Sequence, residues 1–131
     1  STNVFAEKGG LQLDRYNKYE KYGVNLDKMT NVEAAEQVLK TTSKTLCDGK
    51  SPKPEFIRRA NRSYTRMLMD LEFVLSIISE KSKDAEEKEI LKDLERSYSG
   101  YAIKLTGSQR DSYGAGLRGQ FCRALDSAIN E

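Results

Sequence analysis

Apolar positions recur with the period of an α-helix through residues 54–79, the longest such run in the chain. After Pro54, no glycine or proline interrupts it. Because an α-helix turns through about 100° per residue, its apolar positions fall within one arc of about 120°. The pattern therefore predicts one long helix around which the other helices pack. Its expected core positions are Phe56, Ile57, Ala60, Tyr64, Met67, Leu68, Leu71, Val74, Leu75 and Ile78.

The outward face of this predicted helix changes character along its length. It is basic in the first half and apolar in the second, and its positions are Arg58, Arg59, Arg62, Arg66, Met69, Phe73 and Ile77. A helix that is apolar nearly all round is buried on both sides. Either the chain's own helices cover the second face, or that face contacts another molecule. Because monomers rarely leave large apolar patches open, we favour the internal arrangement.

Residues 30–47 carry the signals of a second helix. Thr30 and Glu33 have the spacing of a capping box, which predicts a helix from there to about Cys47. Gly49 suits the left-handed conformation that ends a helix, and a short polar link follows at residues 50–53. The expected buried stripe is Val32, Ala35, Leu39, Thr42 and Leu46.

Two more helices are predicted in the second half of the chain. Ser82 is the expected N-cap of the first, which stops at Gly107 and buries Leu91, Leu94, Tyr98, Tyr101, Ala102 and Leu105. The last helix starts at Ser108 or, as the later alternative, at Ser112. Three glycines weaken its first turns, so this segment either packs closely on a neighbour or stays loop-like until Leu117. Its expected buried face is Leu117, Phe121, Ala124, Leu125 and Ala128.

The N-terminal part has weaker signals. Residues 1–10 lack periodicity and predict a flexible arm, and residues 11–22 predict a short helix that Gly23 stops. Tyr16, Tyr19 and Tyr22 alternate with cationic residues. They are either stacking platforms for a nucleic acid or amphipathic side chains at the rim of the bundle. The low net charge favours the rim.

Together these elements predict an all-α fold, an antiparallel bundle of four main helices, with a short fifth helix at the N-terminus as an option. Short links usually join antiparallel neighbours. A chain of 131 residues can form one core, so we expect a single domain over residues 11–131 after the arm. Charged residues make up 32% of the chain, which suits amphipathic helices with polar outer faces.

Cys47 and Cys122 are the only cysteines. Two cysteines allow one intramolecular bridge, but burial as free thiols is the commoner fate and the one we expect. No stretch has the apolar length of a membrane span or of a signal peptide. Cytoplasm is therefore the default location, and removal of a leader before Ser1 stays open.

The composition excludes several kinds of chemistry. The chain has no histidine, so Ser–His and Cys–His nucleophile pairs and histidine metal sites cannot form. Residues 114–119 match the dinucleotide pattern G-x-G-x-x-G, but no predicted strand precedes them and no ribose-binding acid follows at the required distance. A buried pair of Asp70 and Glu72 could do acid–base work, but an ordinary partner such as Arg66 for Asp70 is favoured. We expect no enzyme, cofactor, metal or small-molecule substrate.

Two non-enzymatic functions are left. The first is a helical protein-interaction module (an adaptor, chaperone, inhibitor or assembly subunit) that binds a partner or itself through the outward face from Arg58 to Ile77. The alternative is a nucleic-acid-binding protein that uses the arginines at 58–66, because residues 52–66 hold five basic residues and one acidic residue. A net charge of only +2 favours the first. The sequence leaves open whether the chain is a monomer, a domain-swapped dimer or a filament subunit.

Overall fold

A computed structural model describes residues 18–58, 62–107 and 112–130 of the chain. The predicted arm at 1–10, Tyr16 and Arg59 lie outside these ranges. The elements in chain order are η1 (Glu20–Tyr22), α2 (Asn31–Leu46), β1 (Cys47–Asp48), β2 (Ser51–Pro52), α3 (Pro54–Arg58), α4 (Arg62–Lys81), α5 (Ala85–Gly107) and α6 (Ser112–Asn130).

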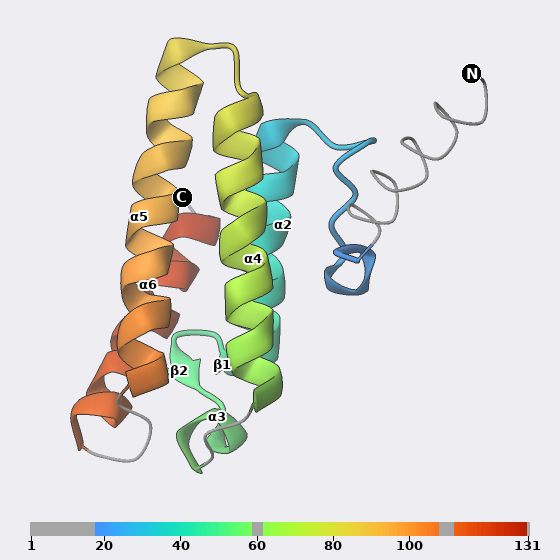
Figure 1. The fold of residues 1–131 in the computed structure, drawn as a ribbon. Helices are drawn as coiled ribbons and strands as arrows, with labels where there is room; N and C mark the ends of the chain where they lie inside the picture. The colour runs from blue at the N-terminus through green and yellow to red at the C-terminus, as the bar shows by residue number, and fades with distance from the viewer. Residues whose placement is uncertain (1–17, 59–61, 108–111, 131) are drawn as a thin grey trace.

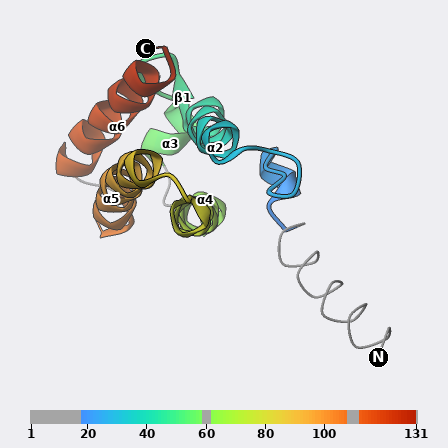
Figure 2. The ribbon, with the colours of Figure 1, turned by 90° about the horizontal axis from the view of Figure 1, so that it is seen from above.

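The four long helices form an up-and-down antiparallel bundle, so the predicted all-α fold is confirmed. Figure 1 shows α4 and α5 side by side and running in opposite directions. Seen from above in Figure 2, α2, α4, α5 and α6 surround a common core, and α4 lies at a corner between α2 and α5. A helix at a corner of the bundle keeps one face toward solvent.

The start of α2 confirms the predicted capping box. The backbone N–H of Glu33 donates to Thr30 Oγ1 at 3.1 Å, and the backbone N–H of Thr30 donates to Glu33 Oε1 at 2.9 Å. The expected stripe on α2 is buried except at Val32, which is exposed. That part of the prediction was wrong because Val32 lies in the first turn, at the end of the bundle beside the start of α5.

The segment after α2 differs from the expected polar link. Strands β1 and β2 pair antiparallel, with Cys47 opposite Pro52 and Asp48 opposite Ser51. Gly49 has the predicted left-handed conformation, with φ of +60°, but it lies at the first of two central positions of a hairpin turn. A type II′ turn needs glycine at that position. The hairpin turns the chain toward α6.

Within the predicted helix at 54–79, the structure describes α3 and α4, and residues 59–61 between them lie outside the described residues. Phe56 is buried, whereas Ile57, expected in the core, is exposed.

The boundaries of the last two helices depend on local polar groups. Asp84, rather than the predicted Ser82, caps α5, because the backbone N–H of Glu87 donates to Asp84 Oδ1 at 2.9 Å. Helix α5 is described over Ala85–Gly107. Helix α6 is described over Ser112–Asn130 and is helical through its glycine-rich first turns, and the other expected start, at Ser108, lies outside the described residues. The loop-like alternative before Leu117 was therefore wrong.

Cys47 and Cys122 form a disulfide bond, so the expectation of free thiols was wrong. Their Cα atoms are 5.8 Å apart although 75 positions separate them in sequence. Both residues are buried. The bond joins the hairpin after α2 to the middle of α6, a proximity that depends on the fold and leaves no local pattern.

Candidate interaction surface on helix α4

Helix α4 has a fully packed inner face and an open outer face. Its buried positions are Met67, Leu68, Leu71, Val74, Leu75, Ile78 and Ser79. On the opposite side, Met69 is 57% exposed and Phe73 is 46% exposed. The internal arrangement favoured from the sequence was therefore wrong for these two residues. Helices α2 and α5 pack against other sides of α4, which lies in front of α2 and beside α5 in Figure 1.

Ile77 differs from its two neighbours on this face because it is half-buried and packs against the core. The segment before α2 lies along this flank of α4. Tyr22 Oη donates to Asp70 Oδ2 at 2.6 Å, and Lys81 Nζ donates to the carbonyl oxygen of Leu26 at 3.3 Å. These two bonds hold the segment beside α4 and leave the adjacent face open.

We define the α4 outer stripe as five residues on this open side: Arg66, Met69, Phe73, Ile77 and Glu80. Arg66 and Glu80 are both exposed, one at each end of the apolar positions. The stripe repeats every three to four residues, so its members line one side of the helix. It has an apolar centre with a cation at one end and an anion at the other.

Lys18 lies against the centre of the stripe. Its ammonium nitrogen is 5.7 Å from the centroid of the Phe73 ring and 5.0 Å from the centroid of the Tyr19 ring. A cation at such a distance is attracted by the ring's negative face. Because Lys18 is exposed and has a long flexible side chain, it covers Phe73 only in part.

Asp70, weighed above as half of a buried acid–base pair with Glu72, is bonded to Tyr22. Burial raises the pKa of Tyr22 well above its usual value, and the bond to Asp70 and the charge of that carboxylate raise it further. Tyr22 is thus a neutral hydroxyl donor at physiological pH. Asp70 has this tyrosine as its partner, in place of the Arg66 expected from helical spacing.

The structure brings together part of the predicted site. Arg66, Met69, Phe73 and Ile77 share one side of α4. Arg59 lies outside the described residues, and the structure does not describe the side chains of Arg58 and Arg62. The sequence reasoning missed Glu80. Its position seven residues after Phe73 was the available signal.

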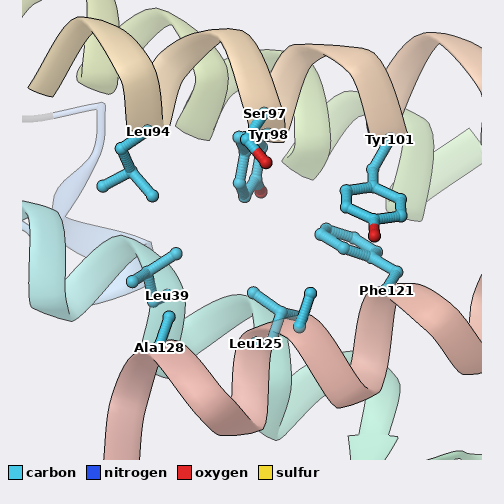
Figure 3. Close-up of a pocket in the computed structure, with 9 residues that line it drawn as sticks. Leu39, Leu94, Ser97, Tyr98, Tyr101, Phe121, Leu125 and Ala128 are labelled. Carbon is cyan, nitrogen blue, oxygen red and sulfur yellow. The ribbon is translucent and has the colours of Figure 1, made fainter. Parts of the chain in front are cut away.

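A second surface feature is a pocket between α5 and α6 of about 80 Å³. Figure 3 shows its lining side chains, among them Tyr101 stacked on Phe121 with ring centroids 4.9 Å apart. Ala124 and Ala128 were expected in the core, but they are exposed and line this pocket, because α5 and α6 leave a gap there. No charged residue lines the pocket, so it offers no anchor for a charged ligand.

No group of three or more His, Cys, Asp or Glu side chains in the described ranges is placed to hold a metal ion. Among the described helices, none is both long enough and apolar enough to cross a membrane. A comparison with protein-family models found no match, and neither did comparisons with curated proteins or with solved structures.

Proposed function

We propose that this protein is a non-enzymatic helical interaction module that binds another protein chain through the α4 outer stripe. The observation that carries the proposal is the exposure of Met69 and Phe73, 57% and 46%, at the centre of a helix whose opposite face is fully packed. Methionine, aromatic residues and arginine are the types enriched at the cores of protein interfaces. Burying the rest of these two side chains would contribute about 2–3 kcal/mol.

The charges beside the stripe favour a protein over a nucleic acid. Asp70 and Glu72 are interleaved with the stripe in the sequence of α4 and Glu80 is its last member, and carboxylates oppose a phosphate backbone. The nucleic-acid alternative depends on the arginines at 58–66. It predicts binding that weakens steeply with salt, whereas an interface centred on Met69 and Phe73 depends little on salt.

We also infer that the protein acts in an oxidising compartment, in place of the cytoplasm expected by default. The buried Cys47–Cys122 disulfide supports this, because disulfides persist in secreted, periplasmic and extracellular proteins and are rare in the cytosol. The partner would then be a protein of the same compartment.

A site-specific photo-crosslinker tests the proposed function. Benzoylphenylalanine replaces Phe73 in one variant and, as the control, Ile103 of α5, which is 66% exposed. Each variant is irradiated in an extract of the protein's source. We expect a defined protein adduct from position 73 that is absent from position 103, survives raised salt and disappears when Met69→Glu is added. Equal adducts from both positions, or a nucleic-acid adduct from position 73, would contradict the proposal.

A further inference from the structure

We propose that the chain bound by the α4 outer stripe is a second copy of this protein, with the two α4 helices packed antiparallel about a two-fold axis at Phe73. The proposal rests on the function proposed above and adds the identity of the partner and the register of the contact. It comes from the order of residues in the stripe and from the open position of α4 in the bundle.

The stripe is symmetric about Phe73 in spacing. Met69 and Ile77 each lie four residues from Phe73, and Arg66 and Glu80 each lie seven residues from it. When two copies of α4 run antiparallel with Phe73 opposite Phe73, each residue faces the one at equal distance on the other side. Met69 of one copy then faces Ile77 of the other. Both apolar pairs and the central ring pair bury apolar surface.

The same register pairs opposite charges at both ends. Arg66 of each copy faces Glu80 of the other, so the dimer contains two such pairs, related by the two-fold axis. A two-fold interface requires this self-complementarity, because one patch is used by both subunits. A parallel arrangement would instead place Arg66 opposite Arg66 and Glu80 opposite Glu80. Like charges in such positions are destabilising, so the charge pattern selects the antiparallel pairing.

The other residues of α4 bring no like charges opposite each other in this register. Asp70 faces Ser76, and Thr65 faces Lys81, so no like charges meet between residues 64 and 82. The steps of three or four residues keep the stripe on one side of α4, which suits two long helices packed nearly in line. Neither view of the fold shows a described element across the outer side of α4 (Figures 1 and 2).

The size of the contact predicts a weak, reversible dimer. From Arg66 to Glu80 the stripe is about 21 Å long at 1.5 Å per residue. One helix from each copy buries an area at the low end of specific interfaces, below about 1,200 Å². Lys18 must also leave the Phe73 ring before the two rings meet. Its exposed, flexible side chain allows this.

Sedimentation velocity of the purified chain over a wide concentration range tests the proposal. We expect the average mass to rise from monomer to dimer. Arg66→Glu and Glu80→Arg should each weaken the dimer about tenfold, because each replaces two attractive pairs by two repulsive ones. The double variant Arg66→Glu/Glu80→Arg restores opposite charges and should return to within about threefold of the original dissociation constant. Lys104→Glu, a charge reversal at an exposed position of α5, should change nothing.

The outcomes separate this proposal from the one it rests on. A monomer at every concentration, with position-73 adducts to a different protein retained, overturns the second copy and leaves the stripe as the binding surface. A monomer with no specific adduct overturns both. A dimer that the double variant fails to restore overturns the register. If either reversal lowers the helix content seen by circular dichroism, Arg66→Gln and Glu80→Gln replace the reversals, with about threefold weakening expected from each.

Discussion

At the scale of single residues, the hydroxyl of Tyr98 is a polar group hydrogen-bonded within the core. Thr42 Oγ1 donates to the carbonyl oxygen of Val38 at 2.7 Å, which uses its one proton. The Tyr98 hydroxyl, 2.8 Å from the same oxygen, therefore donates to Thr42. Burial raises the pKa of Tyr98 well above its usual value. The fold thus favours the neutral form of this side chain.

Tyr98→Phe should lower the free energy of unfolding by about 1 kcal/mol near pH 7, because it removes one buried hydrogen bond and leaves Thr42 bonded to Val38. It should also weaken the dependence of stability on alkaline pH. A group whose pKa is raised by folding stabilises the protein fully below its unfolded pKa of about 10, and loses that contribution as pH rises further. Urea unfolding near pH 7, about pH 9 and about pH 11 measures both effects.

Tyr101→Phe is the matched control, since its ring is half-buried on the same helix. It leaves the bond between Tyr98 and Thr42, and the alkaline contribution of Tyr98, in place. Tyr22, whose pKa is raised as well, contributes a similar alkaline loss that Tyr98→Phe leaves in place. Identical pH dependence in Tyr98→Phe and the original chain would show that the buried hydroxyl does not favour the fold.

The candidate site was partly predictable at this scale. Met69 and Phe73 follow from helical periodicity alone, because the phase of an amphipathic helix depends only on spacing within it. Whether they are covered depends on which sides of α4 other helices occupy, and no local pattern carries that information. The contact of Tyr22 with Asp70 joins residues 48 positions apart, and only the folded chain brings them together.

At the scale of elements, signals confined to a few residues predicted the structure well. Thr30 with Glu33 starts α2, and Gly23 ends η1 with φ of +80°. Each acts through its own backbone or through a bond across a single turn. The hairpin after α2 was not predicted, because its strands are two residues each.

Thr30→Ala should lower the free energy of unfolding by about 1 kcal/mol, because the N–H of Glu33 loses its side-chain acceptor at the start of α2. Thr45→Ala, the same substitution inside the same helix, should be neutral or slightly stabilising, since alanine has the higher helix propensity. Urea unfolding followed by circular dichroism measures both. Equal losses in the free energy of unfolding from the two variants would mean that the hydrogen bond at the cap adds no stability, because a threonine without that bond would then contribute as much.

At the scale of the whole molecule, short links and four amphipathic segments were sufficient to predict an antiparallel bundle. They were not sufficient to predict that α4 lies at a corner, or that the hairpin reaches α6. Both depend on the order in which the helices surround the core, and the same pattern of apolar positions fits several such orders. The disulfide and the open side of α4 are consequences of the order that this chain adopts (Figure 2).

Removing the disulfide should destabilise the molecule strongly without changing the α4 outer stripe. The bond closes a loop of 75 positions, and such a loop restricts the unfolded chain by roughly 4 kcal/mol. Urea unfolding with and without a phosphine reductant measures the loss, and a thiol titration verifies complete reduction.

The variant Cys47→Ala/Cys122→Ala is the control, because it should match the reduced protein and no longer respond to reductant. An unchanged unfolding midpoint after full reduction would show that helix packing alone holds the hairpin against α6. A large loss would instead support the inferred oxidising compartment, because the bond persists there.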